Sequence, residues 1–243
     1  MTNCRRLLVV SALLTFGSSA FAQQSPDEWQ WSFAPYFWAA GLDGDVRVGS
    51  IEADIDFNFG DIVDVLAGAA LFHFEAQNGR HGFFGDFVYL ALEPDTKPLP
   101  LGGGLDMEVD STIIELGYLL KGQGGRDQPG VEFGIRQWDF DTELRTANFG
   151  TFDRSTDWTD FFFGYRGTSD IGANWRSISR INIGSGGSDF ALGADVTFLR
   201  DLDSGNAFAV GLKVLTVDEQ DLDGVPFAID TGFAGMTIGY VFR

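Results

Sequence analysis

Long segments of alternating polar and apolar residues are the feature that most restricts the fold of this chain. A β-strand places successive side chains on opposite faces, so alternation with a period of two predicts strands rather than helices. Each segment has ten residues or more, which exceeds an ordinary globular strand and matches a tilted transmembrane strand. The segments are Trp29–Ala40, Asp45–Phe57, Ala67–Gln77, His81–Glu93, Met107–Lys121, Val131–Leu144, Asp157–Gly167, Trp175–Gly184, Asp189–Arg200, Ala207–Asp218 and Phe227–Arg243.

The two faces of these segments differ in a way that favours a membrane barrel. Phe72 and Phe74 lie on one face of their segment, and His73 and Glu75 lie on the other. A soluble sandwich would direct such aromatic residues inward, whereas a small transmembrane barrel directs them to lipid and keeps a polar interior. Strand length, the 32 glycines and the last segment favour the barrel. We therefore predict an all-β, antiparallel, up-and-down transmembrane β-barrel.

The N-terminus predicts export. Arg5 and Arg6 precede an apolar stretch, Leu7 to Phe16, and Ala20-Phe21-Ala22 has the small-x-small pattern that signal peptidase cleaves. The stretch is too short to span a bilayer as a helix. We expect residues 1–22 to be a cleaved signal peptide and residues 23–243 to form the barrel. Cleavage removes Cys4, the only cysteine, and with it thiol chemistry and thiolate zinc sites.

Composition excludes other classes of protein. The formal net charge of −19 argues against binding of nucleic acid through a basic surface. Disordered chains are poor in apolar and aromatic residues, but this chain is 44% hydrophobic and 14% aromatic.

The last segment carries a family resemblance. Met236, Ile238, Tyr240 and Phe242 are spaced by two and end in an aromatic residue, which Arg243 follows. The chain resembles the small outer-membrane β-barrel proteins of proteobacteria, the OmpA-type and related barrels of unassigned function. Repeated Gly-x-Arg and Gly-x-Lys motifs and Ala34-Pro35-Tyr36-Phe37-Trp38 extend the likeness along the chain. The repeated motifs are Gly134-Ile135-Arg136, Gly164-Tyr165-Arg166 and Gly211-Leu212-Lys213.

The resemblance implies a location and a set of partners. It implies the outer membrane of a Gram-negative cell, reached through the periplasm, with lipid and lipopolysaccharide around the barrel. Tyr240 and Phe242 would form the signal read by the barrel-assembly machinery, after passage with periplasmic chaperones. Oligomeric state is left open.

The number of predicted strand segments conflicts with the even number expected of a bacterial outer-membrane barrel. Eleven segments are present, but bacterial barrels have an even number of strands with both termini periplasmic. We therefore expect ten or twelve strands, with the error in residues 58–66, where Asp61 to Leu66 could form a short helix or a plug. Long connections at 94–106, 145–156 and 219–226 are expected on the extracellular side.

The polar faces predict a charge network in the lumen. Unpaired charges in a narrow interior are costly, so pairing is expected, and a small barrel is largely filled by its own side chains. A narrow water-filled pore lined by the same groups is the alternative, favoured by twelve strands. The predicted inward acids are Glu75, Asp86, Glu115, Asp160, Asp189 and Asp195, and their predicted partners are Arg136, Arg166, Arg176, Arg180 and Lys213.

Catalytic and metal sites are weakly indicated. His73 and Glu75 share a face and could orient one another as base and acid, but a lipid hydrolase also needs a serine in a recognisable motif. Acidic loops could bind Ca²⁺ or Mg²⁺ but have no defined motif, so a solvated acidic rim is favoured. We predict no catalytic residue, cofactor or metal. Three functions remain: a structural or surface barrel with a closed or nearly closed lumen, a narrow diffusion channel for small solutes, and a lipid-modifying hydrolase using His73 and Glu75.

Overall fold

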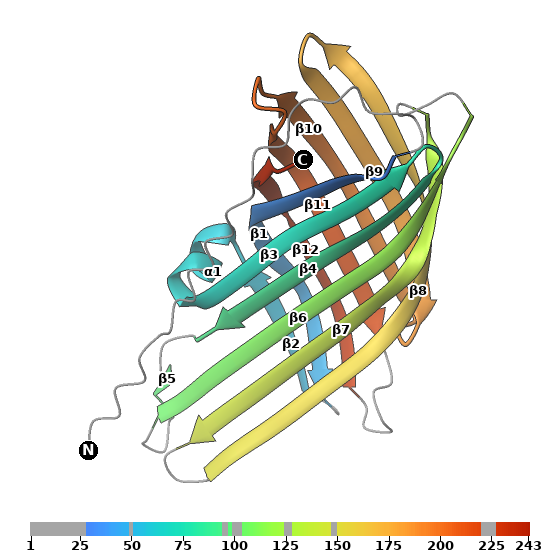
Figure 1. Cartoon of the computed structure of the whole chain (residues 1–243). Coiled ribbons are helices and arrows are strands. Elements are labelled where there is room, and N and C mark those ends of the chain that lie inside the picture. The colour runs from blue at the N-terminus through green and yellow to red at the C-terminus, as the bar shows by residue number, and fades with distance from the viewer. Residues whose placement is uncertain are drawn as a thin grey trace.

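The computed structural model describes residues 28–48, 51–93, 97–98, 104–123, 128–146, 150–219 and 227–243. The predicted signal peptide lies outside the described residues. Twelve strands and one short helix occur in the described chain (Figure 1). They are β1 (Gln30–Val48), β2 (Ile51–Phe57), α1 (Phe59–Val65), β3 (Leu66–Asn78), β4 (His81–Leu92), β5 (Lys97–Pro98), β6 (Gly104–Lys121), β7 (Gly130–Thr146), β8 (Gly150–Gly172), β9 (Trp175–Gly186), β10 (Phe190–Asp201), β11 (Ala207–Glu219) and β12 (Phe227–Val241).

Ten of these strands form a closed antiparallel barrel. Each of β3, β4 and β6 to β12 pairs with its neighbours in chain order, and β1 pairs with both β3 and β12, which closes the sheet. Each strand of the ring therefore pairs on both sides over at least part of its length, and the ring has no free edge strand. The strands are inclined and lie side by side around the barrel wall (Figure 1). The prediction of an all-β antiparallel barrel is confirmed, with ten strands.

The surplus predicted strand is Asp45–Phe57, not residues 58–66. The end of β1 pairs with β2 from Leu42↔Phe57 to Val48↔Ile51, so this segment is a hairpin attached to β1. Among the described strands β2 has no other partner, so it adds no member to the ring. Residues 59–65 form helix α1. Its first residues are fixed by a capping box, in which the Asn58 side chain accepts from Gly60 N and Asp61 N, and Asp61 accepts from Asn58 N.

The two rims of the barrel differ. We call the rim where β1 begins and β12 ends the terminal rim, and the opposite one the far rim. Turns at the terminal rim are short except for the β6–β7 connection. In the β3–β4 turn Asn78 pairs with His81, and Gly79 between them has φ 54°, a conformation that glycine adopts without strain. The connections predicted to be long all leave from the far rim. Residues 145–156 are nevertheless mostly strand, because the β7–β8 ladder continues to Thr146↔Gly150.

Large apolar side chains cover the outside of the barrel. We call this surface the apolar belt. It contains at least one large side chain, between 38% and 70% exposed, from each of the ten strands. Representatives in ring order are Phe33, Phe74, Phe83, Leu116, Phe133, Phe161, Ile183, Phe198, Leu212 and Met236.

Aromatic contacts surround part of the terminal rim. Trp29 stacks on Phe83 with ring centroids 5.8 Å apart, Phe83 contacts Tyr118 at 5.2 Å, and Tyr118 contacts Phe133 at 5.3 Å. On β7 the belt ends at Ile135, and the next residue on that face is Gln137, which donates a hydrogen bond to Asp157 of β8. The belt therefore has an aromatic border on one side and a polar border on the other.

Candidate functional site

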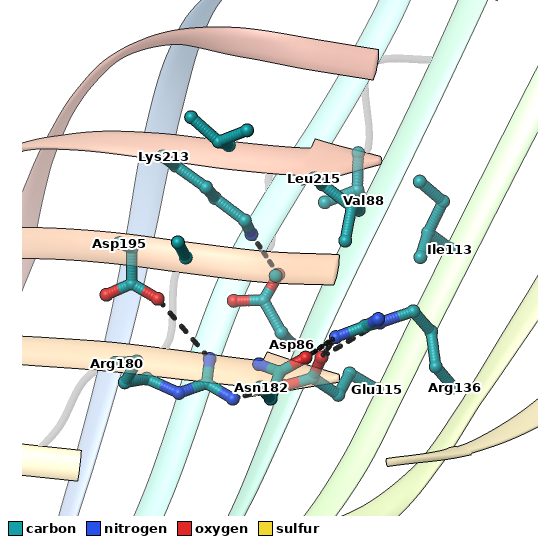
Figure 2. A pocket seen from close by; sticks show the side chains of 13 residues that line it. Asp86, Val88, Ile113, Glu115, Arg136, Arg180, Asn182, Asp195, Lys213 and Leu215 are labelled. Carbon is teal, nitrogen blue, oxygen red and sulfur yellow. Dashed lines mark hydrogen bonds and ion pairs between the residues drawn. The ribbon is translucent and has the colours of Figure 1, made fainter. Parts of the chain in front are cut away.

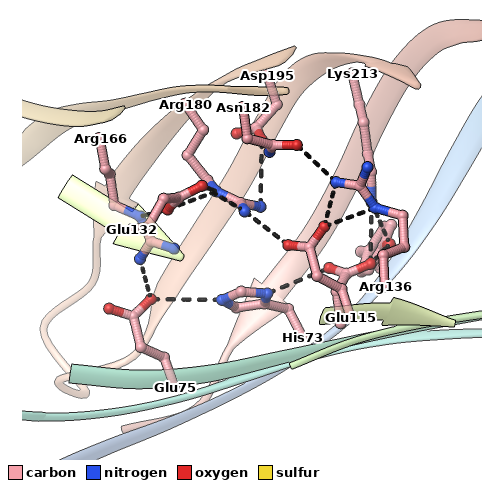
Figure 3. A network of polar contacts seen from close by, with 12 residues as sticks. His73, Glu75, Glu115, Glu132, Arg136, Arg166, Arg180, Asn182, Asp195 and Lys213 are labelled. Carbon is pink, nitrogen blue, oxygen red and sulfur yellow. Dashed lines mark hydrogen bonds and ion pairs between the residues drawn. The ribbon is translucent and has the colours of Figure 1, made fainter. Parts of the chain in front are cut away.

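A layer of paired charges fills the middle of the barrel. We call it the ion-pair layer, and its side chains come from eight strands, β3, β4 and β6 to β11 (Figure 3). The alternation that directs the belt outward directs these residues inward. The layer contains His73, Glu75, Asp86, Glu115, Glu132, Arg136, Arg166, Arg180, Asp195 and Lys213.

Arg180 is the centre of the layer. Its guanidinium lies 2.7 Å from a Glu115 oxygen, 2.7 Å from a Glu132 oxygen and 3.6 Å from Asp195. Arg136 holds the other Glu115 oxygen at 2.6 Å and donates to the Asn182 side-chain oxygen at 2.7 Å. Glu115 thus bridges two arginines, and these contacts offset the desolvation of charges that are almost completely buried.

The absence of a side chain at Gly193 makes room for this arrangement. A Cβ atom at Gly193 would lie 2.8 Å from the Asn182 amide oxygen and 3.1 Å from an Arg136 nitrogen. The layer is therefore packed against backbone on the β10 side.

His73 joins two parts of the layer. Its Nδ1 faces Asp86 at 3.2 Å and its Nε2 faces Glu75 at 3.4 Å. Glu75 also receives Arg166 at 3.0 Å, and Arg166 in turn contacts Glu132 at 3.1 Å. An ionised carboxylate only accepts, so two such neighbours favour a His73 ring that donates from both nitrogens. With that proton, five cations balance the five carboxylates of the layer.

Asp86 continues the layer to the first strand. Lys213 lies 2.9 Å from an Asp86 oxygen and donates to the Tyr36 hydroxyl at 3.0 Å, and Tyr36 donates to Asp86 at 2.8 Å. The guanidinium carbons of Arg166 and Arg180 also lie over the Phe84 ring, 4.6 and 4.8 Å from its centroid. These cation–π contacts seal the terminal side of the layer with an apolar ring.

Three predicted residues lie outside this layer. Asp160 is buried but has no basic partner in the described chain: it accepts from Trp138 Nε1 at 2.9 Å, Ser188 N at 2.7 Å and Gly187 N at 3.1 Å. It therefore closes the β9–β10 turn instead of pairing with a base. Arg176 lies at the terminal rim, 2.9 Å from Asp201.

The prediction that Asp189 points into the lumen is wrong. It lies exposed in the same β9–β10 turn, where the strand alternation stops before Phe190. At the terminal rim, Arg243 contacts the same Asp201 at 2.6 Å, and its backbone N donates to Asn206. The residue that follows the terminal aromatic is thereby held to the neighbouring turn.

Aromatic and aliphatic side chains form a second layer on the far-rim side of the charges, which we call the aromatic layer. Trp138 and Trp158 stack with centroids 5.8 Å apart, Phe140 stacks on Trp158 at 5.6 Å, and Trp38 contacts Phe233 at 5.9 Å. These residues belong to one buried cluster with Leu71, Val88, Leu90, Ile113 and Leu215.

A small cavity separates the two layers (Figure 2). Asp86, Glu115, Arg136, Arg180 and Lys213 line one side, and Val88, Ile113 and Leu215 line the other. Its accessible volume is about 20 Å³, room for about one water molecule.

Sequence reasoning missed three members of this site. They are Glu132, Asn182 and Tyr36, and each follows the alternation of its strand. Glu132 lies four residues from Arg136 and Asn182 lies two residues from Arg180, both predicted inward residues. Tyr36 lies two residues from the aromatic Trp38. A strict count of every second residue would have found Glu132, which is completely buried.

The contacts of His73 do not suit a general base, because each ring nitrogen already faces a carboxylate rather than a hydroxyl. Among the described residues no group of His, Cys, Asp or Glu is arranged to hold a metal ion. No helix in the described part of the chain is long and apolar enough to cross a membrane.

The geometry defines a class of protein: a closed, ten-stranded antiparallel β-barrel with an apolar exterior and an interior filled by an ion-pair layer and an aromatic layer. No family model matches the chain, and no curated protein matches it.

Solved structures give distant matches. One is the attachment invasion locus protein Ail of Yersinia pestis, solved in complex with the heparin analogue sucrose octasulfate: 11% identity, 87% of this chain, 98% of that chain and a TM-score of 0.41. Another is the β domain of the Bordetella autotransporter BrkA: 10% identity, 85% of this chain, 97% of that chain and a TM-score of 0.29. These values are too low to transfer an activity to this chain.

Proposed function

We propose that this protein is an integral outer-membrane β-barrel of a Gram-negative cell, with a structural or surface role and a lumen closed to solutes. After cleavage of the signal peptide it crosses the periplasm and inserts with the terminal rim on the periplasmic side. The far rim, with its longer connections, then faces the outside of the cell.

The apolar belt supports the membrane location. Contiguous apolar patches on soluble monomers rarely exceed a few hundred Å², and larger ones mark membrane or protein contacts. Here such side chains occur on all ten strands, and the aromatic contacts at the terminal rim resemble the girdle of a transmembrane barrel. Membrane lipid and lipopolysaccharide are the partners that this surface fits.

The two filled layers of the lumen are the observation that carries the closed-lumen proposal. A diffusion channel needs a continuous polar path, but the aromatic layer is apolar and the ion-pair layer uses its charges on one another. The two layers follow one another along the barrel axis, so either one is enough to block the passage of a solute.

Single-channel recording in planar bilayers tests this function. The purified protein should insert without producing stable ohmic steps, and the mobility of the unboiled protein on gels establishes that it is folded. Regular conductance steps that scale with salt concentration would replace this proposal with a narrow diffusion channel for small solutes.

Assembly is the second part of the proposal. Tyr240 and Phe242 stack edge to face at 4.9 Å at the end of β12, and Phe242 is 47% exposed, so we assign this aromatic pair as the signal for the barrel-assembly machinery. Phe242→Ala should lower the amount of protein in the outer membrane and increase its residence with periplasmic chaperones. Phe208→Ala, which removes another exposed aromatic residue near this rim, is the matched control; equal losses would argue against a terminal signal.

We further propose that His73 and Glu75 link charges and do not hydrolyse lipid. Mass spectrometry of lipid A and phospholipids from cells that overproduce the protein should show an unchanged profile. A new deacylated species that disappears with His73→Ala would instead establish the hydrolase.

A further inference from the structure

The wall of the barrel is incomplete beside β1. Strand β1 pairs with β3 only from Gln30↔Gln77 to Pro35↔Phe72, and it meets β2 only from Leu42 onward. Residues 36–41 pair with β12 on one side, but no described strand pairs with them on the other. The wall therefore opens between β1 and the first half of β3.

Unpaired backbone groups face this opening. Phe33 exchanges both of its backbone hydrogen bonds with Phe242 of β12, at 3.0 and 2.8 Å, and the same register continues to Tyr36↔Gly239. In an antiparallel ladder successive residues point their N–H and C=O groups to opposite sides. The backbone groups of Trp38 and Ala40 are thus directed toward the opening, which is costly in hydrocarbon unless something covers it.

An apolar pocket occupies the opening. Its lining residues are all hydrophobic and include both an outward residue of β1, Phe37, and the adjacent inward residue, Trp38. Because adjacent residues of a strand face opposite sides of the wall, the pocket crosses the wall. The remaining lining residues are Ala40, Phe59, Ile62, Val63, Leu66, Ala69, Leu71, Leu90 and Phe233.

Helix α1 covers the pocket from outside. Ile62 is its buried residue and fills the opening, whereas Phe59 and Val63 are 39% and 45% exposed and extend the apolar belt. Phe59 contacts Phe37 edge to face at 5.8 Å. Seven residues form less than two helical turns, so α1 is only marginally stable by itself and depends on these contacts.

One polar group in the lining has no partner. Trp38 is 6% exposed, and its indole N–H has no acceptor among the described residues. A buried donor of this kind costs free energy until an oxygen reaches it.

We propose that this lateral pocket takes an acyl chain of a membrane lipid, which enters from the hydrocarbon side as α1 moves outward. The pocket is continuous with the apolar belt, which selects an aliphatic chain, and the Trp38 N–H selects an ester or amide oxygen near the start of that chain. The free volume is about 20 Å³ because Ile62 occupies the opening, so the chain takes the place of this side chain. The inference rests on the proposed membrane location of the barrel.

Photolabelling by lipid tests the proposal. The protein is folded into phosphatidylcholine vesicles containing a phosphatidylcholine with a diazirine on one acyl chain close to its ester, and labelled residues are mapped by mass spectrometry. Leu71 and Leu90 point into the barrel, so a lipid can label them only through the opening. Phe161 and Phe163, on the opposite part of the wall, report contact with bulk lipid.

Matched variants distinguish a lipid chain that enters the pocket from one that only lies close to the barrel wall. Ala69 lines the pocket, and Ala70, the next residue, is exposed but does not line it. Ala69→Phe should reduce inward labelling about tenfold by overfilling the site, and Ala70→Phe should leave it unchanged. If Ala69→Phe fails to fold, Ala69→Leu is used in its place. Ile62→Ala should increase inward labelling, because it removes the side chain that occupies the opening.

The outcomes are distinct. Labels on Phe161 and Phe163 but not on Leu71 or Leu90 would overturn the pocket and leave the membrane location standing. Labels on neither set would refute the membrane location itself. Inward labelling that Ala69→Phe and Ala70→Phe change equally would also overturn the proposal.

Discussion

Arg180→Met should be far more damaging than Arg176→Met, although both arginines lie on β9, four residues apart, and both point inward. Methionine keeps most of the aliphatic stem and removes the charge. Arg180 lies 2.7 Å from both Glu115 and Glu132 and is the only cation of the layer within 4 Å of Asp195 in the described chain. Its removal leaves the layer with one uncompensated negative charge.

The expected magnitudes follow from burial. Breaking a buried ion pair by removing one partner costs about 3–5 kcal/mol of unfolding free energy. Asp201, the partner of Arg176, is 34% exposed and keeps Arg243 at 2.6 Å, so Arg176→Met should cost roughly 0–1 kcal/mol. The two variants should therefore differ by about 3 kcal/mol.

Urea unfolding in phospholipid vesicles, followed by tryptophan fluorescence and by gel mobility without boiling, measures both values. Glu132→Gln combined with Arg180→Met tests the cause, because the pair shares two short contacts. The double variant should be less destabilised than the sum of the singles by about 1–3 kcal/mol. Equal costs for Arg180→Met and Arg176→Met, or strict additivity, would refute a coupled ion-pair layer.

Three other predictions follow from single sites. Gly235→Val should block folding, because a Cβ at Gly235 would overlap the Ala39 carbonyl on β1, whereas Gly167→Val should be tolerated; the fraction that migrates as the folded band measures both. Asp160→Asn should cost about 1–3 kcal/mol and speed proteolysis in the β9–β10 turn, because Asp160 accepts charge-assisted bonds from Gly187 and Ser188; unchanged cleavage would contradict this. Trp138→Ala should lower stability by about 3–5 kcal/mol without producing conductance, because the ion-pair layer still closes the lumen.

Strand alternation accounts for most of what the sequence could predict. It places Glu75, Glu115 and Arg136 in the lumen and Phe161 and Phe163 outside, because the period of two is a local property of each strand. It fails where strands end. Asp189 fits the polar–apolar alternation of the sequence, but it lies in a turn, where side chains do not alternate between two faces.

The opening beside β1 could not be predicted from alternation. Asp45–Phe57 has the pattern of a barrel strand, and only its pairing shows that it folds back on β1 as a hairpin. Pairing depends on which strands become neighbours and in which register, and those are non-local properties. The aromatic layer could have been predicted from the alternation, because Trp138 and Trp158 each lie two residues from a predicted inward charge.

The ion-pair layer and the opening are parts of one arrangement. The last β1–β3 pair is Pro35↔Phe72, and the next residue, Tyr36, donates from its hydroxyl to Asp86 of β4 and accepts from Lys213 of β11. Side-chain bonds inside the barrel therefore hold β1 where its backbone bonds to β3 end. Beyond that point Trp38 and Leu71 belong both to the aromatic layer and to the lateral pocket. A chain that enters from the side meets the aromatic layer first, while the charges below it remain paired, so lateral binding does not require the lumen to open.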